Sequence, residues 1–568
     1  MPTQRPSDAE VQRRRRIAVG GIAGFIVLIL FATFVCGDEG GKAVAKSYAK
    51  QWSDQNFQGM YDLLSDESKK QISLEEFSQA QRQALATATV RRLIAHEAKG
   101  YKDGQVAVPF TVETRAFGTL KLVAEIPITD DSTDAKVKWN SSLVLPGLHP
   151  GEQLSRQTSM PPRAAILASN GVALAEGPER TSPIPDVAKE IAGTVGTPDG
   201  GIGLTLQAYG YPQDAKVGIS GLEKIFQQQL AGTPGGTLLA GSRQLANTQP
   251  RPGRNVNSTI VPSIELAAAA ALAGRQGGAT VVEPKTGAVL AAAGSAFSET
   301  APPGSTFKII TAAAALESHA ATLKSTYPYE TQTLLDGRPV QNANGETCGG
   351  SLVQSFANSC NSVFAPLGVK VGSGRLVEMA EKLGFNKSLP NIPNAAVSTI
   401  PPSDQIQGED ATGTTAIGQG QVMASTLAMT MIAATIGNKG VFVQPTLQKG
   451  TKPKTSRAMS ATTAAGVKQM MLAVVRYGTG TSAAITGASI AGKTGTAEIR
   501  DTVPTDPNDP NAPVENDPAN TDAWFVAFAP SWAPRVAVGV FLAGQGHGGD
   551  TAAPAARDIF VEALKKNR

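Results

Sequence analysis

A serine and a lysine three positions apart stand where a Pro-Pro-Gly segment gives way to an apolar run, APPGSTFKIITAAAAL at residues 301–316. The prolines keep the first part out of a helix, so Ser305 is expected at a helix N-terminus. Unpaired backbone N–H groups and the positive end of the helix dipole favour negative charge on oxygen there. Lys308 lies on the same helical face, roughly 5–6 Å away at Cβ. The pair predicts a serine nucleophile with a lysine base.

Lys308 can act as a base only if its ammonium group can lose a proton. A helix that is apolar on every side is normally buried, and burial disfavours an ammonium group, so Lys308 is expected to be partly neutral and to accept the proton of Ser305. Ser-x-x-Lys alone is a weak signal, because chance produces it in a chain of 568 residues. Ser47 and Lys50 also fit it, but they lie mid-helix in a charged segment that gives Lys50 no reason to be neutral.

Two further motifs could complete a site around this pair. Ser359 and Asn361 follow a helical segment and are expected at a helix–helix junction, where a hydroxyl and an amide can point into a cleft. Lys493 to Thr496 (KTGT) lie in a strand-like run after Gly492, and a glycine in a strand often marks close approach of backbone to a ligand. Lys285 to Gly287 repeat the Lys-Thr-Gly triplet, but in a predicted hairpin turn that needs glycine for its backbone angles.

The unit that must position these residues is predicted to span residues 258–568. We expect a first helix, a hairpin, the Ser305 helix, a helical middle that continues to Lys439, three strands and a closing helix. The bounds are Ser263–Ala273, Ala279–Val282 with Ala288–Ala293, then Ala491–Glu498, Trp524–Phe528, Val536–Leu542 and Ala555–Lys565. Strands from both ends of the unit with helices between them predict one sheet sandwiched by helices.

The preceding residues predict two further parts. Residues 38–150 read as helices followed by strands, which favours an antiparallel sheet with helices on one face. The helices are Lys42–Trp52, Phe57–Leu64 and Ser73–Leu85, the last with a Ser73/Glu76 capping box, and the strands are Val90–Ala98, Gln105–Thr114, Thr119–Pro127 and Val137–Leu145. This part shows no catalytic constellation and reads as a spacer or interaction module. Residues 151–246 read as an irregular bridging domain, followed by a linker at 247–257.

An apolar segment near the start predicts a membrane anchor. Arg13–Arg16 precede the uncharged run Ile17–Cys36, whose roughly 20 residues can cross a hydrocarbon core of ~30 Å. We therefore expect a cytoplasmic tail at 1–16, a transmembrane helix at 17–36 and the rest of the chain outside. A cleaved signal peptide and a lipid-modified Cys36 are the alternatives. The run is long for a signal peptide, and bulky residues stand where both alternatives need small ones.

Composition bounds the number of domains and the classes of ligand that the protein could bind. The length suggests three or four domains, and 41% hydrophobic residues suffice for a sizeable core. The net charge of +4 equals the contribution of the four consecutive arginines, so the remainder is near neutral and nucleic-acid binding is not expected. Three cysteines and four histidines show no zinc-site spacing, so neither a metal nor a cofactor is expected. Cys348 and Cys360 could pair in an oxidising compartment or remain two buried thiols.

The order of the motifs identifies a family. Ser-x-x-Lys, Ser-x-Asn about 50 residues later and Lys-Thr-Gly on a late strand form the trio of penicillin-binding proteins and class A β-lactamases. The chain resembles a class B penicillin-binding protein of actinobacterial type, a membrane-anchored D,D-transpeptidase of cell-wall synthesis. Gly218–Gly236 resemble the segment ahead of its catalytic domain, Arg163–Ala175 its pedestal, Gly418–Gln421 a cleft motif, and residues 38–148 the NTF2-like module of the resistance-type subgroup.

This resemblance implies the fold and the site. The fold would be α+β and multidomain, with a penicillin-binding/β-lactamase-like transpeptidase domain after an NTF2-like domain and a β-rich pedestal. Ser305 would be the acylated nucleophile and Lys308 its base. Ser359 would relay protons between Lys308, Lys493 and the leaving amine, while Asn361 would hold the substrate's peptide backbone.

The Lys-Thr-Gly strand would bind the substrate's carboxylate. Lys493 adds positive potential, and Thr494, Gly495 and Thr496 would hold the terminal carboxylate of a D-Ala-D-Ala stem. The backbone N–H groups of Ser305 and Thr496 would form the oxyanion hole. Cys360 fits the middle position of Ser-x-Asn, where packing or a bridge to Cys348 is the expected role.

The resemblance implies peptidoglycan stem peptides and β-lactams as ligands, the plasma membrane as location and a separate glycosyltransferase, SEDS-type or class A, as a candidate partner. The same acylation followed by water would give a carboxypeptidase or a β-lactamase. A β-lactam sensor or a catalytically silent scaffold is the third alternative. A bifunctional class A enzyme is disfavoured, because the first 150 residues are too short for a glycosyltransferase domain. The acidic insertion Arg500–Thr521 is expected beside the cleft, as a gate, a partner site or an inert loop.

Overall fold

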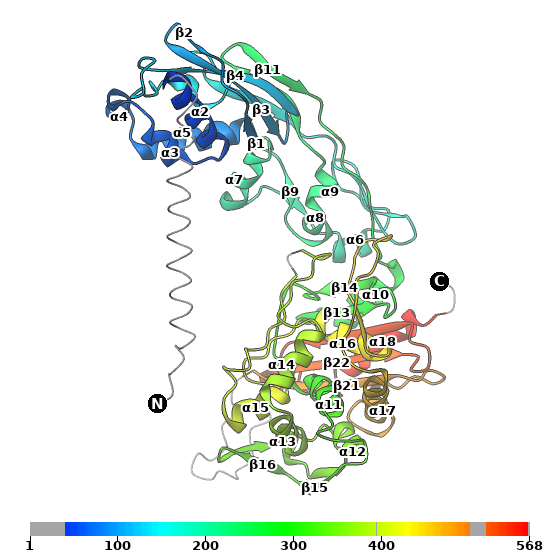
Figure 1. Cartoon of the computed structure of the whole chain (residues 1–568). Helices are drawn as coiled ribbons and strands as arrows, with labels where there is room; N and C mark the ends of the chain where they lie inside the picture. The colour runs from blue at the N-terminus through cyan, green and yellow to red at the C-terminus, as the bar shows by residue number, and fades with distance from the viewer. Residues whose placement is uncertain (1–39, 394, 500–517, 566–568) are drawn as a thin grey trace, which may run out of the picture. The chain divides into compact units, whose positions relative to one another are not determined.

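The computed structural model describes residues 40–393, 395–499 and 518–565 (Figure 1). The predicted cytoplasmic tail, the predicted transmembrane helix and residues 500–517 of the acidic insertion lie outside this described part. Among the helices of the described ranges, none combines the length and the apolar character that a membrane span needs. The chain forms two compact units. Unit 1 contains the chain up to Pro162 with residues 197–216 and 231–253, and unit 2 contains residues 163–196, 217–230 and 254 onwards.

The first part of unit 1 contains four helices and an antiparallel sheet. The helices are α2 (Gly40–Ser53), α3 (Phe57–Asp62), α4 (Asp66–Gln71) and α5 (Leu74–Thr87), and the strands are β1 (Val90–Ala95), β2 (Tyr101–Lys102), β3 (Gln105–Thr114) and β4 (Thr119–Pro127). β3 lies between β1 and β4, and every second residue of β3 is buried. The capping box of Ser73 and Glu76 is present at the start of α5. The predicted helices packed on one antiparallel sheet are therefore confirmed.

The strand predicted at Val137–Leu145 is wrong. Val137 makes only isolated bridges, and Ser141–Val144 form a 3-10 helix. Asn140 is responsible, because its side-chain oxygen accepts the backbone N–H of Ser142 at 2.9 Å and turns the chain. The apolar residues that suggested a strand, Val137, Leu143 and Leu145, are buried in the core of unit 1 all the same.

Both units share the segment that reads as a bridging domain. In unit 1, β5 (Leu154–Ser159), β10 (Gly235–Ala240) and β11 (Arg243–Thr248) form a sheet in the order β11-β10-β5, and α7 (Gly200–Ala208) is a short helix. In unit 2, β6 (Ile166–Leu167) lies between β7 (Ala173–Ala175) and β12 (Val256–Asn257), and β8 (Val195–Gly196) pairs with β9 (Val217–Gly218). The same segment also contains helices α6 (Pro185–Ile191), α8 (Gly221–Ile225) and α9 (Gln227–Ala231). The domain boundaries at 151 and 246 stay a prediction.

A buried ion cluster holds the first part of unit 2 together. Glu223 of α8, whose side chain is 1% exposed, accepts from Arg163 Nε at 2.5 Å and pairs with Arg180 at 2.7 Å. Two arginines around one carboxylate supply the hydrogen bonds that a charge needs away from water.

The central sheet of unit 2 brings together strands from both ends of the unit. Its order is β14-β13-β23-β22-β21, with β13 (Gly277–Val282), β14 (Val289–Gly294), β21 (Ala491–Glu498), β22 (Thr521–Ala529) and β23 (Val536–Leu542), all antiparallel. Every residue of β22 and β23 is buried, as expected for strands with both faces covered. The predicted sheet sandwiched by helices is confirmed (Figure 1).

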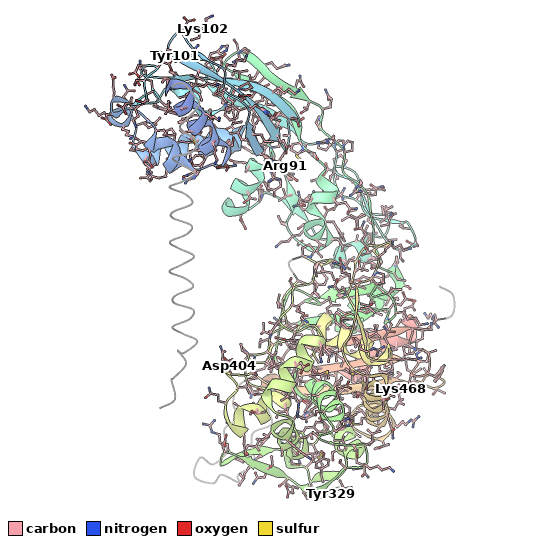
Figure 2. All side chains as sticks on the ribbon, in the orientation of Figure 1. Arg91, Tyr101, Lys102, Tyr329, Asp404 and Lys468 are labelled. Carbon is pink, nitrogen blue, oxygen red and sulfur yellow. A yellow bond between two sulfur atoms is a disulfide. The ribbon has the colours of Figure 1, made fainter. Side chains whose placement is uncertain are left out.

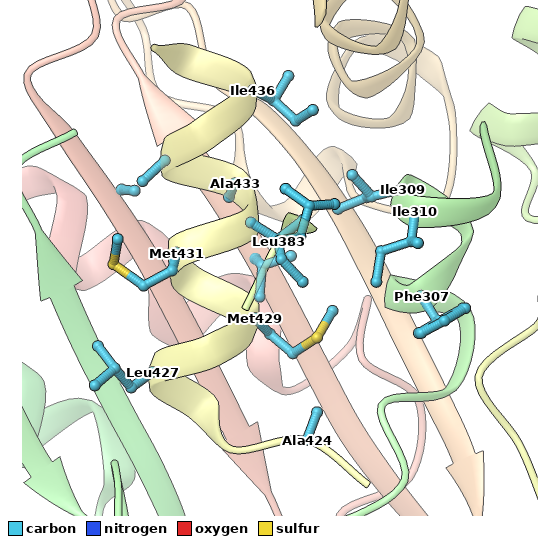
Figure 3. Close-up of a cluster of buried hydrophobic side chains, with 14 of the residues drawn as sticks. Phe307, Ile309, Ile310, Leu383, Ala424, Leu427, Met429, Met431, Ala433 and Ile436 are labelled. Carbon is cyan, nitrogen blue, oxygen red and sulfur yellow. The ribbon is translucent and has the colours of Figure 1, made fainter. Parts of the chain in front are cut away.

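Helices cover the two faces of this sheet. α10 (Pro262–Leu272) and α18 (Ala552–Ala563) bury one face, while α11 (Lys308–Glu317), α16 (Thr426–Gly437) and α17 (Ala461–Tyr477) belong to the larger core on the other face. Figure 3 shows α16 lying over the strands, with Ile309 and Ile310 of α11 pointing toward it beside Leu383. All these apolar side chains are buried, so the helix that follows Ser305 is held on its whole circumference.

A buried acidic side chain accepts a hydrogen bond from the edge strand β14. Glu265 of α10 is fully buried and accepts the backbone N–H of Ala292 at 2.8 Å through Oε2. Among the described residues, Oε1 has no hydrogen-bond partner. Burial raises the pKa of Glu265 to about 7, opposed by the Ala292 hydrogen bond and reinforced by the charge of Glu190.

The helical middle predicted up to Lys439 is wrong for residues 326–351. There β15 (Thr326–Glu330) pairs with β18 (Cys348–Ser351), and β16 (Gln332–Leu335) with β17 (Arg338–Gln341) form a hairpin. Asp336 and Gly337 at its tip both have positive φ, the geometry of a two-residue hairpin turn, which the Asp-Gly pair in the sequence signals. Tyr329, 63% exposed, lies at the outer end of this region (Figure 2).

Unit 2 contains further helices and strands. They are α12 (Leu352–Ala357), α13 (Asn361–Val371), α14 (Ser373–Lys382), α15 (Gly408–Ala416), β19 (Val441–Val443) and β20 (Thr455–Arg457).

Candidate active site

Ser305 lies in a 3-10 turn, Gly304–Phe307, that leads directly into α11. The prediction of a helix N-terminus is confirmed in substance, since the apolar helix begins at Lys308. Gly304 has φ +50°, and a Cβ built on it would lie 2.4 Å from the carbonyl oxygen of Thr496. Only glycine therefore allows the nucleophile turn to approach β21 this closely.

Lys308 is fully buried beneath Ser305, and three oxygen atoms of the site lie within 3.0 Å of its Nζ. Its Nζ lies 3.0 Å from Ser305 Oγ, 2.6 Å from Asn361 Oδ1 and 2.5 Å from the carbonyl oxygen of Ser359. The last two atoms can only accept hydrogen bonds, so they take two N–H groups. A neutral amine has two N–H groups and one lone pair, and the lone pair is then left for the hydroxyl of Ser305.

Ser359 connects two lysines. Its Oγ lies 2.8 Å from Lys493 Nζ and 3.3 Å from Lys308 Nζ. Ser359 stands between α12 and α13 with φ +63°, which confirms the predicted helix–helix junction. A positive φ is costly for a residue other than glycine, and here it turns both the hydroxyl and the carbonyl of Ser359 toward the lysines.

Both lysines are fully buried. Burial, together with the nearby charge of Lys493, holds the pKa of Lys308 well below its ordinary value. Burial alone lowers the pKa of Lys493 to about 7. The rings of Phe364 and Phe356 lie 5.8 Å and 5.6 Å from the respective Nζ atoms. This supports the prediction that Lys308 can act as a base.

The KTGT residues lie on β21, the edge strand beside the serine turn. A Cβ on Gly495 would lie 2.8 Å from the carbonyl of Pro303, so the strand and the turn are in close contact. Thr494 Oγ1 lies 2.5 Å from Thr479 Oγ1, and Thr496 Oγ1 accepts the N–H of Gly548 at 3.4 Å. The structure thus brings Ser305, Lys308, Ser359, Asn361 and Lys493 together and sets Thr494 to Thr496 alongside.

Sequence reasoning missed two contributors, Thr479 and Gly548. Both stand in glycine-rich runs, residues 478–480 and 546–549, and such runs between regular elements are the signal that could have drawn attention to them. The triplet at Lys285–Gly287 lies in the turn between β13 and β14, as predicted.

Cys348 and Cys360 form a disulfide with 5.7 Å between their Cα atoms. The bond joins β18 to the residue between Ser359 and Asn361, which resolves the two alternatives left open by the sequence. Both cysteines are buried, so no free thiol from this pair stands in the site.

Comparison with known proteins identifies the family. The family model for the penicillin binding protein transpeptidase domain matches residues 277–561, half of the chain. The chain belongs to the penicillin-binding transpeptidase family. A second family model, the NTF2-like N-terminal transpeptidase domain, matches residues 40–152. This penicillin-binding transpeptidase is therefore an α+β multidomain protein with an NTF2-like N-terminal domain.

Individual relatives agree with this membership. The chain is 33% identical over 384 residues to the peptidoglycan D,D-transpeptidase PbpA of Mycolicibacterium smegmatis, covering 55% of this chain and 73% of the relative. It is 35% identical over 299 residues to PbpA of Mycobacterium tuberculosis, covering 48% of this chain and 56% of that relative. The crystal structure of PBPA from Mycobacterium tuberculosis matches with a TM-score of 0.55 and 27% identity, over 71% of this chain and 99% of that one. The protein is a penicillin-binding serine D,D-transpeptidase.

Proposed function

We propose that this transpeptidase cross-links peptidoglycan stem peptides through an acyl-enzyme on Ser305, and that β-lactams acylate the same serine. The observation that carries the proposal is the position of Lys308, whose buried Nζ lies 3.0 Å from Ser305 Oγ and whose pKa is lowered by that burial. Solved structures of a relative, penicillin-binding protein A of Mycobacterium tuberculosis, include penicillin G and imipenem acyl-enzyme complexes.

Acylation begins with a proton transfer. Lys308 accepts the proton of Ser305 as Oγ attacks the carbonyl carbon of the D-Ala-D-Ala bond. The negative charge that develops on the carbonyl oxygen is held by the backbone N–H groups of Ser305 and Thr496, each donor contributing about 3 kcal/mol to the lowering of the barrier. The C–N bond then breaks, and the leaving D-Ala amine takes a proton through Ser359, which contacts both lysines.

The β21 side of the cleft binds the donor stem. Thr494 and Thr496 offer hydroxyls to its terminal carboxylate, Gly495 lets the strand approach the stem, and Lys493 supplies positive potential. Asn361 contacts the stem's backbone from the opposite side. A carboxylate between two hydroxyls and a lysine is a charge-assisted arrangement, which favours stems that end in a free carboxyl group.

The second half of the reaction resolves the acyl-enzyme. An amine from a neighbouring stem attacks the ester carbonyl, loses its proton to the site and releases Ser305 with its proton restored. Attack by water instead would make the protein a D,D-carboxypeptidase or a β-lactam-hydrolysing enzyme, and a stable acyl-enzyme alone would make it a β-lactam sensor. A β-lactam completes the first half and then stalls, because its amine remains tethered in the site.

The domain organisation extends this proposal. We place a cytoplasmic tail at 1–16, a membrane anchor at 17–36, the NTF2-like domain at 38–150, a pedestal at 151–246 and the transpeptidase domain at 258–568. The arginines before the apolar run support a catalytic domain outside the membrane, where the stem peptides are. A separate glycosyltransferase, SEDS-type or class A, would supply the glycan strands to be cross-linked.

Covalent labelling tests the nucleophile. We expect a fluorescent penicillin to label the wild-type protein and the Ser47→Ala variant, which alters the other Ser-x-x-Lys, but not Ser305→Ala. Persistent labelling of Ser305→Ala would contradict the assignment. A cross-linking assay with lipid-linked precursor then separates the reactions, because stem dimers indicate transpeptidation and trimmed monomers indicate attack by water.

A further inference from the structure

The orientation of the Asn361 amide decides where the lone pair of Lys308 points. Asn361 Nδ2 donates to the carbonyl oxygen of Gln341 at 2.8 Å, and this leaves Oδ1 facing Lys308 Nζ at 2.6 Å. If the amide were reversed, its N–H groups would face the amine of Lys308 and compete with Ser305 for the lone pair. Gln341 therefore selects the amide orientation that leaves Lys308 available as a base.

Gln341 is the last residue of β17, so its place depends on how the β16–β17 hairpin is held. Leu335 and Val340 pack the hairpin against the core, and polar contacts at its two ends attach it further. At its tip Arg338, whose side chain is 78% exposed, pairs with Asp410 at 3.1 Å, and Asp336 accepts the N–H of Asp410 at 3.0 Å. At the open end of the hairpin, where its strands begin and end, stands Asn342, which is 5% exposed. Exposed ion pairs contribute little to stability, so the contacts of Asn342 at the open end attach the hairpin more strongly than those at its tip.

Asn342 joins the hairpin to the first turn of α13. Its Oδ1 accepts the backbone N–H of Ser362 at 2.9 Å, and its Nδ2 lies 3.1 Å from Ser362 Oγ. The same Nδ2 donates to the carbonyls of Glu330 at 2.8 Å and Glu346 at 2.9 Å, on either side of the hairpin. Ser362 directly follows Asn361, so one buried amide fixes the spacing between Gln341 and Asn361.

We propose that Asn342 is a positioning residue for acylation, which holds Gln341 against Asn361 so that Asn361 directs its oxygen to Lys308. The proposal rests on the proposed roles of Ser305 and Lys308. Asn342 itself contacts neither of them. It acts through Gln341 and Asn361.

Replacing Asn342 by alanine removes every one of these hydrogen bonds while leaving the catalytic residues in place. The Asn361 amide can then adopt both orientations, and the reversed one disables the base. A general base contributes on the order of 10²–10⁴-fold to a rate, so we expect the acylation rate constant to fall at least roughly tenfold. Reversible binding of the penicillin should weaken by a smaller factor than acylation slows, because the contacts on the β21 side are untouched and only the Asn361 contact is disturbed.

A double-mutant cycle on stopped-flow acylation by a fluorescent penicillin tests the route of action. If Asn342 works through Asn361, the double variant Asn342→Ala, Asn361→Ala acylates as slowly as Asn361→Ala alone. Multiplying effects, or wild-type acylation by Asn342→Ala, would overturn the proposal. Arg338→Ala, which releases only the exposed tip of the hairpin, is the matched control and should acylate at the wild-type rate. An equal loss there would assign the effect to general loosening instead.

The pH profile adds a readout that loss of structure does not move. Without an acceptor facing Nζ, the charged form of Lys308 loses a hydrogen bond, so the acidic limb of the acylation profile should shift to lower pH as the plateau falls. A lower plateau with an unmoved limb would count against the proposal. Asn342→Ser, which keeps a short acceptor for the N–H of Ser362, provides the same comparison if the alanine variant does not fold. Wild-type labelling at Ser305 is unaffected by either outcome, so the proposed function is tested separately.

Discussion

Replacing the buried carboxyl of Glu265 by an amide should change how the stability of unit 2 depends on pH. The pKa of Glu265 is raised from its ordinary value of 4.5 to about 7, chiefly by burial. The folded state therefore holds the proton more tightly than the unfolded state, and stability falls as pH rises from about 4.5 to 7. Each pKa unit is worth 1.36 kcal/mol, so the ionised carboxyl costs about 3 kcal/mol above pH 7.

Glu265→Gln keeps the shape and the acceptor for Ala292 N–H but cannot ionise. We expect the variant to unfold at higher urea than the wild type at pH 8, by about 3 kcal/mol in the free energy of unfolding, and by under about 1 kcal/mol at pH 5. The comparison between wild type and variant cancels the contribution of unit 1. Glu378→Gln on the exposed surface of α14 serves as the matched control. Its difference from the wild type in the free energy of unfolding should be the same at pH 5 and pH 8.

A pH-independent difference between wild type and Glu265→Gln would refute this reasoning. It would mean that Glu265 is ionised in the folded protein over the whole range, or that its proton is held equally in the unfolded chain. Destabilisation at both pH values would instead show that the amide cannot replace the carboxyl at the edge of β14.

Two further predictions concern backbone approach and buried charge. Gly304→Ala should abolish penicillin labelling with the fold retained by circular dichroism, because its Cβ would meet the carbonyl oxygen of Thr496. The control Gly374→Ala, whose Cβ would meet no other atom, should label normally, and normal labelling of Gly304→Ala would contradict the close approach. Glu223→Gln should lower the free energy of unfolding by roughly 3 kcal/mol in urea, because two largely buried arginines lose their counter-charge, and a change below about 1 kcal/mol would contradict that.

The features that could be predicted from the sequence are those that depend on local residue patterns and on the order of the motifs. Lys493 could be assigned to a strand and Ser359 to a helix junction, because period, glycine position and spacing are properties of short segments. The sandwiched sheet followed from strand-like runs at both ends of the unit. The Ser73 capping box was likewise readable, since it needs only two residues three apart.

What could not be predicted depends on pairing between distant segments. Nothing local to Thr479 indicates that its hydroxyl meets Thr494, and nothing local to Asn342 indicates Ser362 as its partner. The β16–β17 hairpin was hidden for a different reason, because its Asp-Gly turn was outweighed by the helices on either side. At Val137–Leu145 the apolar pattern was read correctly as buried but wrongly as a strand, since the Asn140 turn decides the backbone there.

The strand order of the central sheet has a consequence for how the enzyme is made. β13 pairs with β23 from Gly277↔Leu542 to Val282↔Ala537, and the hydrogen bond between Ser359 and Lys493 joins residues 134 positions apart. Neither can form until the late strands have been synthesised and brought beside the early ones, and such long loops close slowly. A nascent chain that stops before Val536 carries Ser305 but no completed sheet behind β21. The surroundings of Ser305 are therefore complete only when segments from the last part of the chain have joined the early ones.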